Sequence, residues 1–218
     1  MLTLIYTLCK YLISPPFCIS CKRYLQERVP LCVQCTELIK PALPVQVPLV
    51  QHSTITVYAV SLYEDPIKSL ILAKARSHRI ASVQLAELIW QFTPLQALAI
   101  DYFVPVPLHW TRLAWRGYNQ ATVIAELLAR KKGVHVKHAL KRVRKTAFQS
   151  SKTQAQRKHN VARVFQCSYA NSQLYANKTI VLVDDLMTTG ATLASAAQEL
   201  LKLKPARIIA VVACRTER

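Results

Sequence analysis

The sequence predicts an α/β domain built on a parallel sheet and preceded by a small segment that four cysteines hold together. From residue 51 onward, strand-like aliphatic runs alternate with helical patterns, the order found in parallel sheets with right-handed crossovers. Before that point, the spacing Cys-x-x-Cys occurs twice. The 218 residues are enough for one such domain and a small appendage. We therefore expect two parts, residues 1–50 and residues 51–218.

The N-terminal part begins with an apolar stretch whose spacing predicts an amphipathic packing helix, ended by Pro15 and Pro16. This stretch is too short to span a bilayer and lacks the features of a secretory signal. Contact of this helix with a membrane is the alternative to packing. Since no longer apolar run follows, we expect a cytoplasmic protein with no transmembrane segment. The proline-rich residues 36–50 predict an extended linker.

The main domain has elements that can be placed in order. The run at residues 178–185 is almost continuously aliphatic, which is typical of a central parallel strand covered on both faces. In such sheets, ligands bind beyond the carboxyl ends of the strands. The other predicted strands are residues 55–64, 99–109, 134–140 and 206–216, and the predicted helices are residues 65–92, broken around 76–79, 119–133 and 191–204.

Four cysteines have the spacing of a structural metal site. Two Cys-x-x-Cys pairs separated by ten residues can converge to present four thiolates to Zn²⁺ in a tetrahedron. Such a site is closed, so the metal would fold the segment and take no part in catalysis. An intracellular chain argues against disulfides. Lys22 and Arg23 permit contact of this segment with DNA without requiring it. The four predicted zinc ligands are Cys18, Cys21, Cys32 and Cys35.

Positive charge is concentrated in one block of the chain. The formal net charge is +18, and residues 127–183 carry 13 lysines and arginines and no acid. Such a block attracts polyanions, including nucleic acid and pyrophosphate, although a solvated basic face is the usual alternative. The candidate nucleic-acid-binding residues are Arg142, Arg144, Lys145, Lys152, Arg157 and Lys158.

A second candidate site follows the central strand. Asp184 and Asp185 end this strand, and a small, hydroxyl-rich turn leads into the next helix. Backbone N–H groups, threonine hydroxyls and the helix N-terminus can together hold a phosphate. Carboxylates beside it suit sugar hydroxyls or a divalent cation, or else they only cap the helix or end the strand. We expect the two acids to stand outside the field of the basic block. The turn residues are Thr188, Thr189, Gly190, Ala191 and Thr192.

Arginines and aromatics follow the second predicted strand, where the same crevice should open. Arg112 and Arg116 can bind phosphate bidentately, or they are solvated neighbours four residues apart. Trp110, Trp115 and Tyr118 lie among them. Base stacking is one interpretation of these aromatics, and packing of the tryptophans in the core is the other.

The residues VLVDDLMTTGATL (181–193) resemble the motif that binds phosphoribosyl pyrophosphate (PRPP) in the type I phosphoribosyltransferase fold. The resemblance implies that Asp184 and Asp185 contact the ribose hydroxyls, that residues 188–192 hold the 5-phosphate, and that Mg²⁺ binds with PRPP. In a transfer reaction the two acids would anchor the sugar and stabilise developing positive charge, which makes them the candidate catalytic residues. Lys74, Arg112 and Arg116 complete the candidate PRPP-binding set.

Three features in this order resemble the ComF family over nearly the whole chain. They are the four-cysteine segment, the run PVPLHWTRLAWRGYNQA (105–121) and the PRPP motif. Members of the family are bacterial competence proteins and their GntX-like relatives, associated with natural transformation. Two positions depart from the family pattern. Ala75 replaces an aromatic after Lys74, which weakens Lys74 as a pyrophosphate contact, and Lys152 replaces a leucine, which adds charge to the basic block. Further matching residues are Arg144, Thr146, Gln149, Arg157, Asn160 and Phe165.

Three functions are compatible with these features. The first is a competence protein that acts in DNA uptake, binding single-stranded DNA through the basic block and a ribose phosphate in the pocket. The second is a phosphoribosyltransferase that transfers ribose 5-phosphate from PRPP to a nitrogenous base, with residues 141–163 as a flap over pyrophosphate. The third is a non-catalytic PRPP-binding adaptor for a competence helicase. The sequence does not distinguish turnover from binding.

Overall fold

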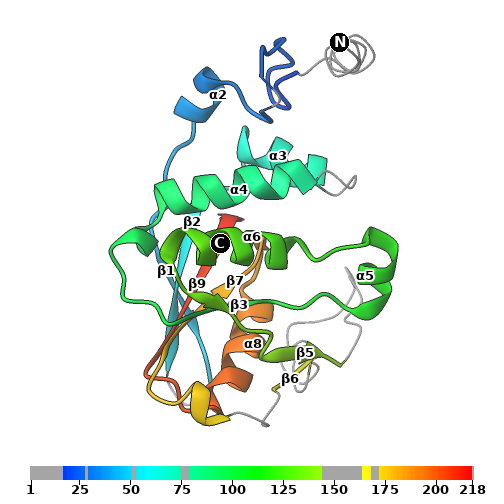
Figure 1. Cartoon of the computed structure of the whole chain (residues 1–218). Helices are drawn as coiled ribbons and strands as arrows, with labels where there is room; N and C mark the ends of the chain where they lie inside the picture. Colours follow the sequence, from blue (N-terminus) through cyan, green and yellow to red (C-terminus); the bar gives the residue numbers. More distant parts are fainter. Residues whose placement is uncertain are drawn as a thin grey trace.

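A mostly parallel sheet is the framework of the molecule (Figure 1). The structure, a computed structural model, describes residues 17–27, 29–50, 53–74, 79–143, 164–167 and 172–217. Within this part of the chain, the strands lie in the order β1-β2-β9-β7-β3-β4, and β8 pairs with β9. Their bounds are β1 (Val45–Pro48), β2 (Thr54–Leu62), β3 (Tyr102–Pro105), β4 (His135–Val136), β7 (Thr179–Val183), β8 (Leu186–Met187) and β9 (Arg207–Arg215).

Strand β7 is the central strand that its aliphatic run predicts. It pairs in parallel with β9 on one side and β3 on the other, so that Val181 lies opposite Ile209 and Phe103. Its residues from Ile180 to Val183 are fully buried. β2 pairs in parallel with β9, whereas β1 pairs antiparallel with β2 at the edge of the sheet. The parallel α/β fold class is therefore confirmed.

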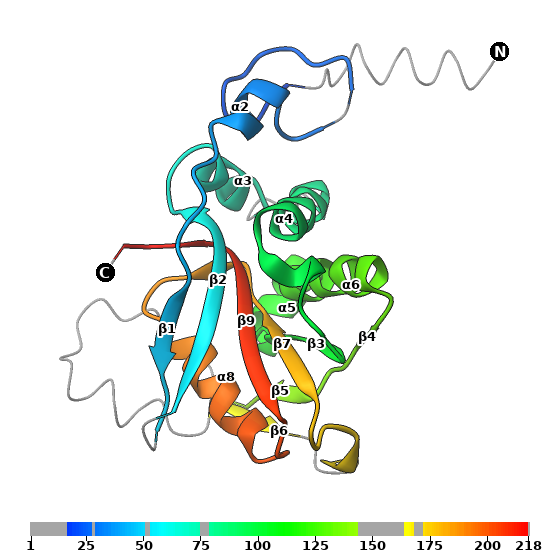
Figure 2. The ribbon, with the colours of Figure 1, turned by 90° about the vertical axis from the view of Figure 1, so that its left-hand side faces the viewer.

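Helices cover both faces of the sheet (Figure 2). α3, α4 and α6 pack on the face to which Val181 and Val183 point. α8 and the antiparallel pair β5–β6 pack on the other face, with Ile180 and Leu182. This division follows from the alternation of side chains along a strand. The bounds are α3 (Ile67–Lys74), α4 (Arg79–Phe92), α6 (Gln120–Lys132), α8 (Ala191–Leu201), β5 (Leu140–Arg142) and β6 (Phe165–Cys167).

The cysteine segment stands beyond α3 and α4 and contains the short helix α2 (Val33–Glu37) (Figure 2). Leu31 and Ile39 of this segment belong to the same buried cluster as residues of α3 and α4. The segment therefore packs on the main domain through apolar contacts. The other short helices among the described residues are α5 (Trp110–Arg116), η1 (Pro94–Gln96) and η2 (Ser172–Leu174).

Two predicted elements differ from the structure. Residues 134–140, predicted as one strand, contain β4 and the first residue of β5, which belong to different sheets. Residues 36–50, predicted as a linker, contain the end of α2 and the edge strand β1, where alternating valines extend the sheet and Pro48 lies at its margin. The division at residue 50 stays a prediction, and the helix predicted before Pro15 lies outside the described residues.

Candidate functional site

Loops that carry predicted site residues meet at the carboxyl edge of the sheet. β7 is followed by Asp184, β3 leads to α5, and β9 is followed by Thr216. Because β9, β7 and β3 are parallel neighbours, their carboxyl ends lie together (Figure 1). This edge is where the ligand crevice of a parallel α/β sheet is expected.

Backbone hydrogen bonds fix the two acids at this edge. The N–H of Asp184 donates to the carbonyl of Val211 (3.1 Å), and the N–H of Ala213 donates to the carbonyl of Asp185 (3.2 Å). The Asp184 carboxylate also accepts from the N–H of Asp185 at 2.8 Å. Both acids are half-buried. Since the N-cap of α8 is Gly190, neither acid caps that helix.

The threonine turn is tied to the end of β9. The N–H of Thr216 donates to the carbonyl of Met187 at 3.0 Å, and its hydroxyl donates to the carbonyl of Thr188 at 3.1 Å. Gly190, at the start of α8, has φ of 75°, a conformation that glycine adopts without steric cost. Gly190 has no side chain with which to cap α8. The Thr189 hydroxyl accepts from the N–H of Ala191 at 3.4 Å, and acceptor atoms of a ligand can approach the other N–H groups of the first turn.

Arg142 of β5 brings the basic block to the acid pair. Its guanidinium lies close enough to Arg112 and to the Asp184 carboxylate for both charges to act on its pKa. Burial lowers the pKa of Arg142, the charge of Arg112 lowers it further, and Asp184 opposes both. The expectation that the acids stand outside the basic field is wrong. The cause is the β5–β6 pair, which packs against α8 and carries Arg142 to this edge.

The segment from Arg116 to Gln120 is anchored to the end of β3. Asn119 donates from Nδ2 to the carbonyl of Val106 (3.0 Å) and, as N-cap of α6, accepts from the N–H of Ala121 (3.1 Å). Buried donors without partners are rare in proteins, which makes such atoms candidates for contacting a ligand. Three in this segment have no hydrogen-bond partner among the described residues, namely Arg116 Nε, Tyr118 Oη and Gln120 Nε2.

Both tryptophans of α5 lie on the surface. Trp110 is 70% exposed and Trp115 is 77% exposed, and α5 contains no buried residue. The core-packing interpretation of these tryptophans is therefore wrong, because α5 projects from the edge of the sheet and covers neither face (Figure 1). Arg112 and Arg116 of the same helix are half-buried.

Several predicted site residues lie outside the part of the chain that the structure describes. Lys74 ends α3, but its side chain is not described. The other predicted residues belong to the stretch between β5 and β6. These two strands pair with each other, and Arg142 lies opposite Phe165. The predicted residues of this stretch are Arg144, Lys145, Lys152, Arg157 and Lys158, and the predicted flap, residues 141–163, falls largely in the same stretch.

The four cysteines converge as their spacing predicts. All four sulfur atoms lie within 4.8 Å of one another, and those of Cys21 and Cys32 are 3.7 Å apart. A tetrahedron with Zn–S bonds of about 2.3 Å has sulfur atoms about 3.8 Å apart, so the arrangement can hold a metal such as zinc. Cys18, Cys32 and Cys35 are buried, and Cys21 is exposed. Cys167 and Cys214 are buried outside this cluster.

Hydrogen bonds within the cluster divide the thiols by acidity. Burial raises the pKa of Cys18, but N–H groups of Cys21, Cys32 and Ser20 outweigh it and lower this pKa to about 6. Burial and the neighbouring thiols raise the pKa of Cys35 to about 12. A divalent cation would favour the thiolate form of all four ligands, because thiolates are the metal-binding form.

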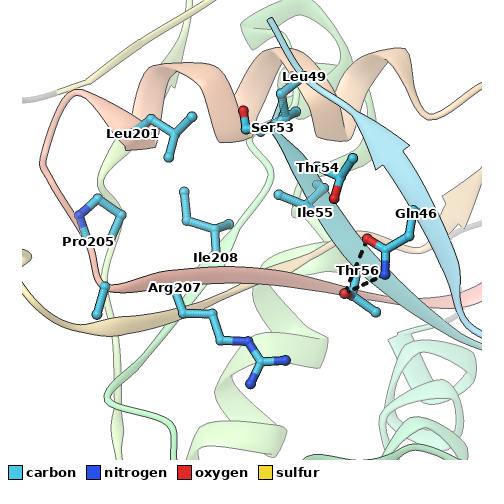
Figure 3. Close-up of a pocket in the computed structure, with 11 residues that line it drawn as sticks. Gln46, Leu49, Ser53, Thr54, Ile55, Thr56, Leu201, Pro205, Arg207 and Ile208 are labelled. Atoms are coloured by element: carbon cyan, nitrogen blue, oxygen red, sulfur yellow. Dashed lines mark hydrogen bonds between the residues drawn. The ribbon is translucent and has the colours of Figure 1, made fainter. Parts of the chain in front are cut away.

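A pocket of about 410 Å³ lies at the opposite edge of the sheet (Figure 3). Thr54 and Arg207, at the starts of β2 and β9, line it together with Gln46 and with Leu201 of α8. The Gln46 amide donates to the Thr56 hydroxyl at 3.0 Å. Because β2 and β9 begin here, this is the amino-terminal edge, and none of the described residues lining the pocket is a predicted site residue.

Comparison with known proteins agrees with this architecture. The chain is 33% identical to the DNA utilization protein YhgH of Salmonella typhimurium, over 91% of this chain and 90% of that protein. It belongs to the ComF family. The Escherichia coli YhgH protein is 32% identical over 72% of this chain and 70% of its own length. Competence protein ComFC of Bacillus subtilis is 36% identical over 45% of this chain and 38% of its own length.

The phosphoribosyl transferase domain model matches residues 116–218 of this ComF protein. The match begins at Arg116 and includes both acids and the threonine turn, so the type I phosphoribosyltransferase fold is confirmed. Among solved structures, adenine phosphoribosyltransferase from Saccharomyces cerevisiae is 16% identical, with a TM-score of 0.32 over 77% of this chain and 83% of that chain. This weak likeness adds nothing to the family assignment.

Two features of the site could not be predicted from the sequence. Thr216, which follows β9, holds the threonine turn by a hydrogen bond, and this contact depends on the pairing of β8 with β9. The approach of Arg142 to Asp184 depends on the position of the β5–β6 pair. In the part of the chain that the structure describes, no helix is long and apolar enough to cross a membrane.

Proposed function

We propose that this protein acts in DNA uptake by binding single-stranded DNA and a ribose phosphate of the PRPP type at the carboxyl edge of the sheet. The observation that carries the proposal is that Asp184 follows β7 and Arg112 follows β3 at the same edge of the sheet, and that the charges of both act on Arg142 of β5. The names of the relatives, competence protein and DNA utilization protein, support the cellular role.

The ribose phosphate is proposed to lie across the end of β7. Asp184 and Asp185 accept hydrogen bonds from the ribose hydroxyls, and residues 188–192 with the start of α8 hold the 5-phosphate. Arg112, Arg116 and Lys74 are proposed to neutralise the diphosphate. The carboxylate and phosphate oxygens gathered here fit Mg²⁺, which prefers such ligands. When bound, Mg²⁺ would offset the charge of the diphosphate.

Single-stranded DNA is proposed to reach the same edge through the basic block. Arg142 is the predicted nucleic-acid-binding residue within the described part of the chain, and it lies within electrostatic range of Arg112. Arg144, Lys145, Lys152, Arg157 and Lys158 continue the block along the sequence. A positive block this close to a ribose-phosphate site suits a polymer of ribose-like sugars and phosphates.

The test is a fluorescence titration of the full chain with a labelled single strand, with and without PRPP and Mg²⁺. Wild type should bind DNA with steep salt dependence, and PRPP should bind on its own in calorimetry. Asp184→Asn combined with Asp185→Asn should abolish PRPP binding and leave the cysteine segment folded. Retention of PRPP affinity by that variant would refute the site, and absence of DNA binding by wild type would refute the nucleic-acid function.

Phosphoribosyl transfer is the second candidate, because the phosphoribosyl transferase domain model covers the acids and the threonine turn. In that case Asp184 and Asp185 would stabilise positive charge developing on the ribose. Release of pyrophosphate from PRPP with a panel of nitrogenous bases would establish turnover, and its complete absence would remove this candidate. PRPP binding with neither turnover nor DNA affinity would leave the adaptor for a helicase.

A further inference from the structure

The short helix α5 exposes large aromatic surface beside the candidate site. Trp110 and Trp115 are 70% and 77% exposed, and Leu113 between them is 43% exposed. Since α5 has no buried residue, these side chains do not contribute to the core. A cluster of large apolar side chains at the surface is typical of an interaction site.

Helix geometry sorts the residues of α5 into two sides. Arg112 and Arg116 are one turn apart and half-buried, and the charge of Arg112 acts on Arg142. With 3.6 residues per turn, the two tryptophans are separated by about 140° around the helix and about 7.5 Å along it. Trp110 and Trp115 therefore offer two separate flat surfaces, one on each flank of the outer face.

The charge around α5 identifies the kind of partner. Glu126 is the only acidic residue in the sequence from 102 to 183. This stretch of the chain therefore suits a partner that combines negative charge with flat apolar groups, as nucleic acids do. In a duplex the bases stack on each other, whereas the bases of a single strand are free to stack on aromatic side chains.

The aromatic surface is continuous with the acid site. α5 follows the carboxyl end of β3, beside the end of β7 that leads to Asp184, and the charges of Arg112 and Asp184 both act on Arg142. We infer that α5 is a base-stacking surface for single-stranded DNA, in which Trp110 and Trp115 stack on bases while Arg112 and Arg116 attract the flanking phosphates. This inference rests on the proposed DNA binding and assigns its contact surface.

The test compares the full chain with variants that lack the rings. Anisotropy titrations use a labelled oligothymidylate and an abasic strand of the same length. Trp110→Ala and Trp115→Ala should each weaken binding of the oligothymidylate by about fivefold or more, the effect of losing one base–aromatic stack. Neither should change binding of the abasic strand or of PRPP. Trp110→Phe and Trp115→Phe should retain most of the affinity, and Leu113→Ala is the matched control.

Intrinsic fluorescence supplies a second readout. Trp90, the third tryptophan, is only partly buried but packs against the core. Quenching by DNA should therefore persist in Trp90→Phe and disappear in the combined Trp110→Phe and Trp115→Phe variant, although that variant still binds.

Each outcome has a distinct meaning. Unchanged DNA affinity in the alanine variants, with wild type binding DNA, would overturn the stacking surface and leave the proposed function intact. No DNA binding by wild type would overturn both. A change of sedimentation mass in these variants without a change in DNA affinity would make α5 an interface between copies of the chain and would also overturn the inference.

Discussion

The guanidinium of Arg142 lies within electrostatic range of the carboxylate of Asp184, although Arg142 belongs to β5 of the small sheet and Asp184 follows β7 of the main sheet. Arg142 is itself held against the ring of Phe165, with its Cζ 5.5 Å from the ring centre. Arg142 therefore brings part of the basic block within electrostatic range of Asp184. This edge of the sheet can thus contact both a sugar and the phosphates on either side of it.

Replacement of Arg142 by alanine is predicted to weaken binding of single-stranded DNA and to lower the slope of log K against log salt concentration by about 1, the effect of one lost phosphate contact. Arg142→Lys keeps the charge but loses the planar contact with Phe165, so its affinity should be intermediate. The measurement is a set of titrations at increasing salt.

Arg130→Ala is the matched control for this experiment. Arg130 is an exposed arginine of the same basic block in the last turn of α6. That end of the helix is near Gln96, whose carbonyl accepts from Lys132, and so lies away from the carboxyl edge. Equal losses of affinity in Arg130→Ala and Arg142→Ala would show diffuse attraction to the block and contradict a contact at Arg142.

Thr216→Val is predicted to loosen the phosphate turn without unfolding the protein. The change keeps the shape of the side chain but removes the hydroxyl that donates to the Thr188 carbonyl. Loss of one hydrogen bond is worth about 1 kcal/mol, so affinity for PRPP with Mg²⁺ should fall by about fivefold in calorimetry. Thr216→Ser should bind like wild type. Equal affinity of the valine and serine variants would show that this tie does not position the turn.

Local sequence patterns predicted the elements that carry the acids and the phosphate turn. The aliphatic run of β7, the adjacent acids and Gly190 are contiguous, and each has a direct backbone consequence. The fold class followed from the alternation of strands and helices. Strand β1 was not predicted, because the sequence of a proline-rich strand at the edge of a sheet resembles that of a linker.

Contacts between distant segments could not be predicted in the same way. The approach of Arg142 to Asp184 requires β5 to leave the main sheet and pair with β6, which no local pattern encodes. The exposure of Trp110 and Trp115 depends on where α5 stands relative to the sheet. A tryptophan in a short helix is compatible with either burial or exposure until that position is known.

The contact between Asp101 and Lys178 should make stability depend on pH. Asp101 accepts from the N–H of Thr179 at 2.9 Å and from Lys178 at 3.0 Å, and these bonds hold its pKa below the ordinary value of 3.8. The unfolded chain therefore takes up a proton first as pH falls. The stabilisation is complete above about pH 4 and is lost as pH falls through the folded pKa.

The contribution of Lys178 to stability depends on pH in the opposite direction. The hydrogen bond and the charge of Asp101 raise its pKa above 10.5, so its contribution is present below that pH and is lost as pH rises through the folded pKa. In urea unfolding at several pH values, Asp101→Asn should flatten the acid limb of the stability curve, and Lys178→Met the alkaline limb. An unchanged acid limb in Asp101→Asn would show that this carboxylate does not contribute to acid unfolding.

Removal of one cysteine ligand is predicted to release the metal and unfold the cysteine segment while leaving the sheet folded. Cys21→Ser changes the exposed ligand, so it disturbs packing least. Because Leu31 and Ile39 pack with α3 and α4, hydrogen exchange should rise across residues 17–39 and the melting temperature should fall. Wild type should hold about one zinc per chain, as measured by elemental analysis. Cys167→Ser, which alters a buried thiol outside the cluster, should keep its zinc.

Two outcomes of the Cys21→Ser experiment decide separate questions. A full equivalent of zinc in Cys21→Ser would contradict the four-thiolate site. Binding of single-stranded DNA by that variant at wild-type affinity would show that the cysteine segment only supports the fold.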